Sequence, residues 1–372
     1  MTVVKPHFSK RRWLQITLLA LNALWIGFML VFIGLTGKLP IMSIFGSAPT
    51  FIFVLVPLLL LALTPLVQRR MMLVIMACIG GVLGATQFEL FLVPLKTVGL
   101  TDTQQSITVF NWNSLMWDEK KDKDAFYHFL TSQQADIYML QEALYSASEH
   151  DATVDKSLYQ TAIPISTAVD GLDYDYLTFD KSDEILSYFP GYYLTHQQQF
   201  MVISKFPIVQ SYLDSSDQFQ VVDVAIKDYP LRLFNVHVAL HLEFKNPATL
   251  AFYQALERRF YTRAIAFDQL QLAIKSTNSD YLVAGDFNSP KTMGTMTQLK
   301  QSHVDLFRYA PERIPLTFEF SGLRLWRFDY MFANNEHRFD VIDFRNFPVP
   351  ALSDHNAQRL VIAIDKKYLG DL

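Results

Sequence analysis

Cysteine is almost absent from this sequence of 372 residues, which contains only Cys78, within an apolar run. A single cysteine excludes an intrachain disulfide and a CxxC metal site, and it disfavours a catalytic cysteine. Its position favours the role of a small buried or lipid-facing hydrophobic residue. Exported domains often lack disulfides too, so this absence does not indicate a compartment.

Acidic residues are nearly missing from the first 95 positions, and a basic excess is missing from the rest. Seven of the 32 Lys and Arg residues, but only one of the 36 acids, Glu89, lie up to residue 95. The other 25 bases and 35 acids give residues 96–372 a net charge of about −10. Proteins that bind nucleic acid through its phosphates usually carry a basic surface. The composition therefore disfavours nucleic acid as a partner without excluding it.

Long apolar runs are confined to the N-terminal quarter of the chain. Three of them, at about 13–35, 51–67 and 71–92, are close to the 20 or so residues that a helix needs to cross a bilayer. We therefore predict a basic N-terminus (1–12), three transmembrane helices within 13–95, and a separate domain at 96–372. A cleaved signal peptide is the alternative for the first run, which is long for a signal core, and buried core helices are the alternative for all three.

Basic residues flank the three runs unequally. Six of them lie on one side of the predicted membrane: Lys5, Lys10, Arg11, Arg12, Arg69 and Arg70. The other side has Lys38 and Lys96. Because Lys and Arg accumulate on the cytoplasmic side, the N-terminus is predicted to be cytoplasmic. Three crossings then make residues 96–372 an extracytoplasmic domain of a multi-pass protein of the cell membrane.

From about Ser106 the sequence changes to short β-rich runs separated by polar helical stretches. Eight runs are predicted as strands: 107–113, 136–142, 200–206, 220–226, 231–238, 281–287, 327–333 and 357–364. Helices are predicted at about 120–133 and 247–275, and irregular structure at 143–195. Helices interspersed with many strands indicate an α/β fold with two packed sheets.

Several of these strands end in polar residues that a core strand does not need. They are Asn113, Glu142, His237, Asp286, Asn288, Asp329, Asp354 and His355. Layered α/β folds present functional side chains at strand ends. Each residue alone has an ordinary alternative: Glu142 as a surface or helix-terminal acid, His237 as a hydrogen-bonded strand histidine, and 285–288 as a plain turn. Their occurrence at six separate strand ends predicts one common site.

These residue types suit the hydrolysis of a phosphate ester. Glu142 and Asp354 are hard oxygen ligands for Mg²⁺ or Mn²⁺, and such an ion neutralises phosphoryl oxygens and the leaving group. His355 can take a proton from water if Asp329 fixes its tautomer. The remaining residues can donate hydrogen bonds to the charge that builds on the phosphoryl oxygens: Asn113, His237 and Asn288.

The ordered motifs resemble those of the endonuclease/exonuclease/phosphatase superfamily, which has the DNase-I-like fold. They are WN at 112–113, LQE at 140–142, ISKFPI at 203–208, NVH at 235–237, GDFN at 285–288, RFDY at 327–330 and SDH at 353–355. The resemblance extends over residues 107–363. It implies a four-layer α/β/β/α two-sheet sandwich, here preceded by three transmembrane helices, and a hydrolase that depends on Mg²⁺ or Mn²⁺.

The resemblance also implies a role for each matching residue. The metal site would consist of Glu142 as main ligand, Asn113 beside it, and Asp354 as a further acid near the metal. The catalytic residues would be His237 and Asn288 on the phosphate, Asp286 on the attacking water, and the pair Asp329 and His355. Whether Asp286 or His355 takes the proton stays open. Leu115 replaces an Asp found in some family nucleases, which disfavours a second metal contact of that kind.

The superfamily acts on many phosphoesters, so the fold does not name the substrate. An acidic domain held at a membrane favours a phosphate ester or anhydride in a membrane lipid or lipid-linked carrier, such as polyprenyl pyrophosphate or a phospholipid headgroup. One alternative is an outward-facing metal-dependent nuclease. Another is a non-catalytic membrane receptor for phosphorylated ligands. The aromatic segment 187–200 is interpreted as an interfacial loop or, alternatively, as packing on the core; no protein partner is indicated.

Overall fold

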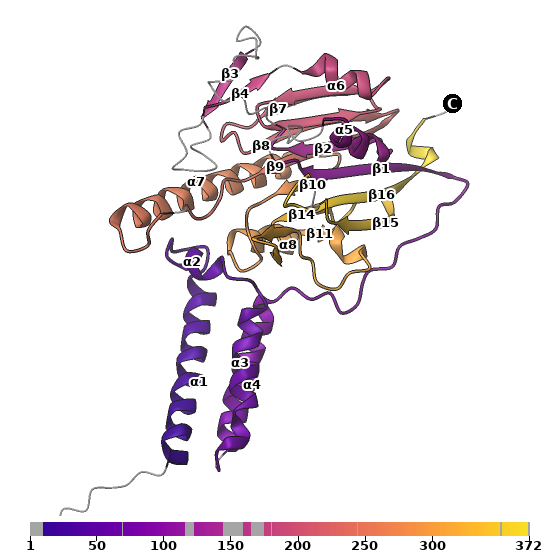
Figure 1. The fold of residues 1–372 in the computed structure, drawn as a ribbon. Helices are drawn as coiled ribbons and strands as arrows, with labels where there is room; N and C mark the ends of the chain where they lie inside the picture. Colours follow the sequence, from indigo (N-terminus) through magenta and orange to yellow (C-terminus); the bar gives the residue numbers. More distant parts are fainter. Residues whose placement is uncertain are drawn as a thin grey trace, which may run out of the picture. The chain divides into compact units, whose positions relative to one another are not determined.

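The computed structural model describes residues 10–68, 70–115, 123–143, 159–164, 175–179, 181–243, 245–349 and 352–370. Lys5 and Arg69, used above for orientation, and part of the stretch 143–195 lie outside these residues. The chain divides into two compact units. A helical unit comprises Met1–Leu90 with Pro290–Met296, and an α/β unit comprises Phe91–Ser289 with Thr297–Leu372 (Figure 1).

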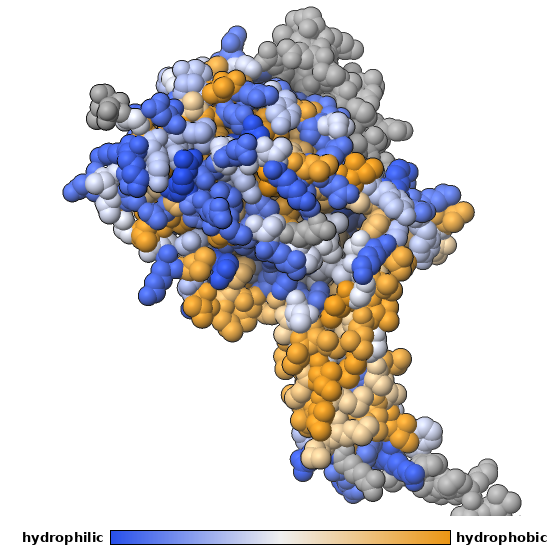
Figure 2. All heavy atoms as spheres, turned by 180° about the vertical axis from the view of Figure 1, so that it is seen from behind, coloured by the Kyte–Doolittle hydropathy of each residue, from blue (hydrophilic) through white to orange (hydrophobic). Residues whose placement is uncertain are grey.

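Two helices of the helical unit are long and apolar enough to cross a membrane, judged by length and composition. These are α1 (Lys10–Leu35) and α4 (Arg70–Gln87). Figure 2 shows their outward side chains as largely apolar, and Leu24 and Val82 are each 70% exposed. Such exposure is unfavourable in water over a large surface. The helical unit therefore has two candidate membrane spans in its described residues.

The middle of the three predicted transmembrane helices is not confirmed. Helix α3 (Ile52–Ala62) continues only through a 3₁₀ turn, η1 (Thr64–Leu66). The apolar stretch Ile52–Leu66 would measure about 22 Å as a helix, against a bilayer core of about 30 Å. Pro65 lies in the turn, where its missing N–H and its ring oppose continuation of the α-helix. Helix α4 likewise ends at Gln87, before the predicted end at residue 92.

The segment Pro290–Met296 packs within the helical unit although it comes from much later in the chain. The Thr36 hydroxyl donates to Thr292 O at 2.8 Å, and the Thr292 hydroxyl donates to Gly46 O at 2.5 Å, in the short helix α2 (Met42–Gly46). Gly37 has a φ of +73°, and a Cβ there would lie 2.8 Å from Gly294 Cα. Two glycines therefore permit the close approach of these backbones.

The α/β unit contains two six-stranded sheets. The first has the order β15 (Phe339–Phe347), β16 (Ala357–Asp365), β1 (Gln104–Asn113), β2 (Ile137–Gln141), β6 (Phe200–Ser204) and β5 (Tyr193–Gln197). The second has the order β11 (His303–Asp305), β14 (Asp329–Asn334), β10 (Asp280–Asp286), β9 (Tyr229–His237), β8 (Phe219–Ile226) and β7 (Ile208–Leu213). Within the sheets β1–β2 and β9–β10 pair in parallel, and the other neighbours are antiparallel.

Apolar side chains of both sheets meet in one core, as Ile107 of β1 and Leu282 of β10 do. The outer face of the first sheet is covered by α5 (Lys123–Ser132) and α6 (Ser182–Tyr188), whose buried side chains form a second cluster with that face. Helix α7 (Leu250–Lys275) lies against the second sheet, where Phe267 contacts Phe287 (Figure 1). The prediction of an α/β two-sheet sandwich is confirmed.

The remaining described elements are short. They are the hairpins β3 (Tyr159–Pro164) with β4 (Asp175–Phe179) and β12 (Phe318–Phe320) with β13 (Leu323–Trp326), helix α8 (Thr295–Ser302), and the 3₁₀ turns η4 (Leu306–Tyr309) and η5 (Lys366–Tyr368). The predicted aromatic segment 187–200 is not a loop, because it contains the end of α6 and all of β5. Phe189 is buried, and Tyr188 stacks on Tyr127 at 3.9 Å. Core packing, rather than an interfacial loop, therefore accounts for most of its rings.

Candidate active site

Side-chain alternation sends the polar ends of five strands into the space between the sheets. In β1, Ile107 and Val109 lie in the inter-sheet core, whereas Phe110 and Trp112 belong to the cluster under the helices. Period-two alternation therefore places Asn111 and Asn113 on the inner face. The same parity puts these strand-end residues on the inner face: Gln141 of β2, Asn235 and His237 of β9, Asp286 of β10 and Asp329 of β14.

A layer of buried amides separates the apolar core from the strand ends. Gln141 donates from Nε2 to Asn111 Oδ1 at 2.9 Å and to Asn235 Oδ1 at 2.6 Å, across the two sheets. Asn235 in turn donates to Leu140 O at 3.1 Å. Buried polar groups with such partners hold a fixed geometry. These amides link β1 and β2 of the first sheet to β9 of the second just below the site residues.

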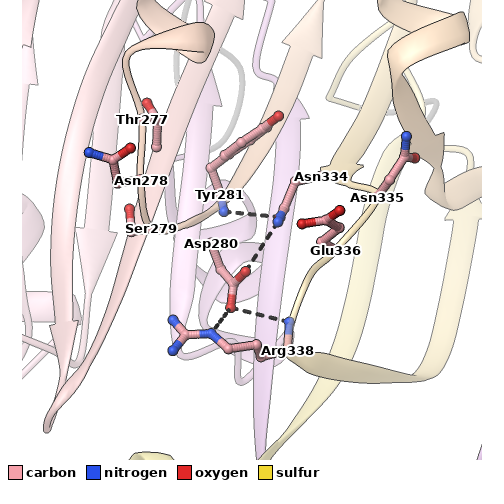
Figure 3. A pocket seen from close by; sticks show the side chains of 9 residues that line it. All are labelled: Thr277, Asn278, Ser279, Asp280, Tyr281, Asn334, Asn335, Glu336 and Arg338. Atoms are coloured by element: carbon pink, nitrogen blue, oxygen red, sulfur yellow. Dashed lines mark hydrogen bonds and ion pairs between the residues drawn. The ribbon is translucent and has the colours of Figure 1, made fainter.

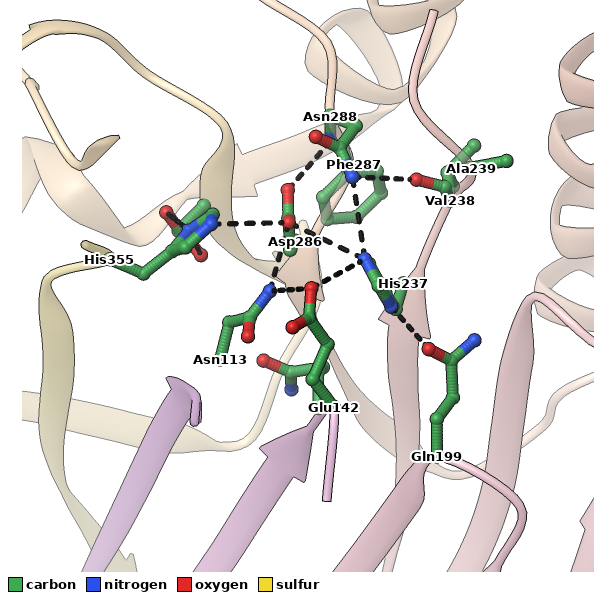
Figure 4. Close-up of polar contacts among 12 residues, drawn as sticks. Asn113, Glu142, Gln199, His237, Val238, Ala239, Asp286, Phe287, Asn288 and His355 are labelled. Carbon is green, nitrogen blue, oxygen red and sulfur yellow. Dashed lines mark hydrogen bonds and ion pairs between the residues drawn. The ribbon is translucent and has the colours of Figure 1, made fainter. Parts of the chain in front are cut away.

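Asn113 brings two carboxylates together. Its Nδ2 donates to Glu142 Oε1 at 3.0 Å and to Asp286 Oδ2 at 3.1 Å, and its Oδ1 accepts from the Leu115 N–H at 3.0 Å (Figure 4). Asp286 is 1% exposed, and burial, together with Asp329, raises its pKa, against the lowering effect of nearby His355 and His237. Glu142 follows β2 of the first sheet and Asp286 ends β10 of the second, so the amide joins the sheets at their polar ends.

The backbone is strained at two of the site residues. Glu142 directly follows β2 with a φ of +50°, and Asn288 follows β10 by two residues with a φ of +45°. The left-handed region is uncommon for residues other than glycine, and such residues persist where their surroundings fix them. At Asn288 the backbone N–H donates to Asp286 Oδ1 at 2.7 Å, and the side-chain Nδ2 donates to Val238 O at 2.9 Å.

His237 is oriented by a glutamine. Its Nδ1 lies 2.5 Å from Gln199 Oε1 and, because an amide oxygen only accepts, Nδ1 carries the proton. Nε2 then faces the site, 3.5 Å from Glu142 Oε1 and 3.6 Å from Asp286 Oδ2. Burial lowers the pKa of His237, although Asp286 opposes that effect. Gln199 was not identified from the sequence, where it appears only as the last of three consecutive glutamines.

His355 is held from the opposite side by Asp329. Its Nδ1 donates to the two Asp329 oxygens at 2.9 and 3.1 Å, which turns Nε2 to within 3.6 Å of Asp286 Oδ2. Burial alone would lower the pKa of His355, but Asp329 and Asp286 outweigh it and raise that pKa well above the usual value. Figure 4 shows Asp286 between the His237 and His355 imidazoles.

One carboxylate oxygen of Asp354 lies near the His355 ring. Its Oδ1 is buried and has no hydrogen-bond partner among the residues that the structure describes. This oxygen lies 3.9 Å from His355 Nε2, while the side chain as a whole is 38% exposed. Burial, with a contribution from the charges of Glu142 and Asp286, raises the pKa of Asp354. The hydroxyl of the preceding Ser353 donates to Asn113 O at 2.8 Å, which ties the SDH turn to the end of β1.

The donor set fits a divalent cation. Carboxylate and imidazole atoms lie within 4.8 Å of one another in two groups, Glu142 with His237 and Asp286, and Asp286 with Asp329 and His355. Adjacent carboxylate oxygens and the buried oxygen of Asp354 concentrate negative charge that a cation would neutralise. An oxygen-rich set of this kind suits Mg²⁺ or Mn²⁺. Of the predicted metal ligands, Glu142 occurs in these two groups. The groups also contain Asp286, which was predicted to be catalytic. The role of each residue and the identity of the ion stay predictions.

A polar hollow of about 480 Å³ lies at the other end of β10 and is separate from this site (Figure 3). Asp280 begins the strand that Asp286 ends, and an extended strand of this length spans about 20 Å. The Asp280 carboxylate accepts hydrogen bonds from Tyr229, Asn334 and Arg338. Its charge is thus taken up by structural partners, and the hollow contributes nothing to the predicted chemistry.

Comparisons with known proteins found a matching family model and a set of similar solved structures. A model of the endonuclease/exonuclease/phosphatase family matches residues 110–355, which span every predicted site residue from Asn113 to His355. Similar solved structures include the AP endonuclease LMAP of Leishmania major, with 14% identity, coverage of 73% of this chain and 93% of that chain, and a TM-score of 0.47. No curated protein sequence matches the chain.

Two further structures show comparable similarity. A truncated TDP2 of Caenorhabditis elegans has 15% identity, covers 69% of this chain and 97% of that chain, and gives a TM-score of 0.43. An endonuclease/exonuclease/phosphatase from Beutenbergia cavernae DSM 12333 has 15% identity, covers 70% and 72% respectively, and gives a TM-score of 0.45.

Proposed function

This chain belongs to the endonuclease/exonuclease/phosphatase family of metal-dependent phosphoesterases, and on that premise we propose that it hydrolyses a phosphate ester or anhydride in a membrane lipid or lipid-linked carrier. The observation that carries the proposal is the convergence of Glu142, Asp286 and the His355–Asp329 pair from both sheets. The candidate substrates are polyprenyl pyrophosphate and phospholipid headgroups.

In this proposal each site residue has its own role, and Asp286 lies among them. A bound Mg²⁺ or Mn²⁺, held by Glu142 with Asn113 and Asp354 near it, would supply charge neutralisation at the phosphoryl oxygens. Asp286 Oδ2 lies 3.6 Å from His355 Nε2, so these two side chains together can orient water and move its proton. Asp329 keeps the His355 ring in one tautomer and orientation. His237 and Asn288 lie beside Asp286 and would contact the phosphoryl oxygens.

Two features support a lipid-borne phosphate. The helical unit has two candidate spans with exposed apolar side chains, which would hold the enzyme at a bilayer and raise the effective concentration of lipid phosphates. The acidic balance of residues 96–372 is poorly suited to a nucleic-acid polyanion.

The full chain in detergent micelles tests the proposal with Mg²⁺ present. Phosphate release from polyprenyl pyrophosphate, phosphocholine release from sphingomyelin and nicking of plasmid DNA are measured in parallel, each against His355→Ala as the background. Turnover of a lipid substrate is the expected result. Plasmid cleavage without lipid turnover would replace the proposal by the nuclease alternative. Tight binding of a phosphorylated ligand without any turnover would favour the receptor.

A further inference from the structure

A buried guanidinium lies behind the active-site loop. Arg263 is in the middle of α7 and is only 4% exposed. Burial lowers its pKa to about 9, an effect that nearby Asp286 opposes, so the side chain is charged at neutral pH. A buried charge is costly unless hydrogen-bonded partners surround it. None of the roles above uses this residue.

The partners of Arg263 are the two loops that carry the site. Its Nη1 donates to Ala239 O, in the loop that follows β9 and His237. Its Nη2 donates to Phe287 O at 3.2 Å and to the Ser289 hydroxyl, on either side of Asn288. A planar guanidinium can make several such bonds at fixed angles, which an ammonium cannot. Arg263 therefore joins the two loops from behind.

One peptide unit connects Arg263 to Asp286. The Phe287 carbonyl accepts from Arg263. The N–H of the same peptide, which belongs to Asn288, donates to Asp286 Oδ1 at 2.7 Å (Figure 4). A cation at the carbonyl end and a carboxylate at the N–H end fix the direction of this peptide, and each hydrogen bond polarises the other. The rotation of the Asp286 carboxylate therefore depends on the guanidinium.

The next peptide is held by a second buried group. His241 lies with Nδ1 2.9 Å from Asn288 O and is 8% exposed. Together with the Asn288 Nδ2 bond to Val238 O, this fixes the left-handed Asn288 on both sides. The amide of Asn288 is then kept 3.4 Å from His237 Nε2.

We propose that Arg263 is a positioning residue for the phosphoesterase reaction, which sets the Asp286 carboxylate and the Asn288 amide without touching the substrate. The inference rests on phosphoester hydrolysis at this site and not on which phosphoester is cleaved. The geometry of the reacting groups changes the activation barrier more than it changes ground-state binding of the substrate. Loss of Arg263 should therefore lower kcat and leave KM nearly unchanged.

The test compares Arg263→Ala with Arg259→Ala in the full chain, on a soluble phosphodiester that the wild type cleaves. Arg259 lies one turn earlier on α7, is 3% exposed and donates to Glu243 at 3.0 Å, so it controls for loss of a buried arginine. We expect Arg263→Ala to lose about 10- to 100-fold in kcat, with partial recovery on addition of millimolar guanidinium. Arg259→Ala should keep kcat within about twofold and show no such recovery.

A second variant covers the case in which Arg263→Ala does not fold. Arg263→Lys keeps the charge but not the planar fork, and it should also lower kcat while keeping KM. Wild-type kcat in either variant, or an equal loss in Arg259→Ala with no effect of guanidinium, would overturn the positioning role. A wild type that cleaves no phosphoester would instead defeat the proposed function itself, so the two failures can be told apart.

Discussion

The buried carboxylate of Asp329 orients the His355 ring. Both Asp329 oxygens accept from Nδ1, at 2.9 and 3.1 Å, and Asp329 is fully buried. We predict that His355→Ala lowers kcat by about 10²- to 10⁴-fold, the usual contribution of proton transfer. Asp329→Asn should also reduce kcat, because an amide can favour the wrong tautomer. The exposed His128 provides the control: His128→Ala should retain full activity, and near-normal rates in His355→Ala would reject the assignment.

Glu142 and Asp286 are expected to make activity dependent on a divalent ion. Their oxygens accept from the same Asn113 nitrogen at 3.0 and 3.1 Å, a concentration of charge that suits Mg²⁺. Chelation should abolish turnover, and added Mg²⁺ or Mn²⁺ should restore it. Glu142→Gln should require a higher Mg²⁺ concentration for half-maximal rate, whereas Glu319→Gln on the β12–β13 hairpin should not. Turnover that is unaffected by chelators would contradict this prediction.

His241 should make the α/β unit less stable in acid. Burial, with the charge of Arg263, lowers its pKa to about 3, compared with 6.5 in the unfolded chain. Between these values the unfolded state binds one proton more than the folded state, so stability falls as pH falls below 6.5, by up to about 1.4 kcal/mol per pH unit. Urea unfolding in micelles should show a weaker pH dependence for His241→Gln than for wild type. If the free energy of unfolding depended on pH equally in both proteins, the pKa of His241 would not be lowered in the folded state.

At the scale of elements, the parallel pair β9–β10 needs glycine at position 285. Gly285 has a φ of +142°, and a Cβ there would run into Val236 O of the neighbouring strand. We predict that Gly285→Ala lowers the free energy of unfolding by at least about 1 kcal/mol. Gly322 is a suitable control, since it has a φ of +77° but nothing within 4 Å of a Cβ. Both variants are measured by urea unfolding. If Gly285→Ala lowered the free energy of unfolding no more than Gly322→Ala does, the neighbouring strand would be able to move away from the added Cβ.

The strands that were predicted from the sequence are those with strong apolar alternation or long buried runs. Strands β1, β9, β10 and β16 are of this kind, and their predicted and observed bounds agree closely. Strand β15 (Phe339–Phe347) was missed because polar and charged residues interrupt its apolar pattern and its register shifts between Val341 and Asp343. Strand β7 was missed as well. It lies at the edge of its sheet and is largely exposed, so it lacks the apolar alternation of a strand that packs on a core.

At the scale of the whole molecule, the location of the α/β unit depends on how many helices cross the membrane. Three crossings place the C-terminus outside the cytoplasm, and two crossings by α1 and α4 place it inside. We predict an extracytoplasmic C-terminus, so that in a bacterial inner membrane a C-terminal alkaline phosphatase fusion is active and a green fluorescent protein fusion is dark. The reverse pattern would mean that the short stretch Ile52–Leu66 does not span the bilayer and that the substrate is reached from the cytoplasm.

The sequence by itself determined the two-sheet α/β class and the set of residues that meet at the site. Both follow from local pattern: alternation shows which side chains face inward, and a polar residue at an inward position is conspicuous at a strand end. Tertiary structure alone decided which atoms touch. Gln199, Arg263 and His241 act through contacts between segments far apart in the chain, and no local pattern distinguishes them from ordinary polar residues. The end of the middle apolar helix, α3, is likewise visible only in the structure. The α-helix ends before the 3₁₀ turn η1, and hydropathy does not mark that position.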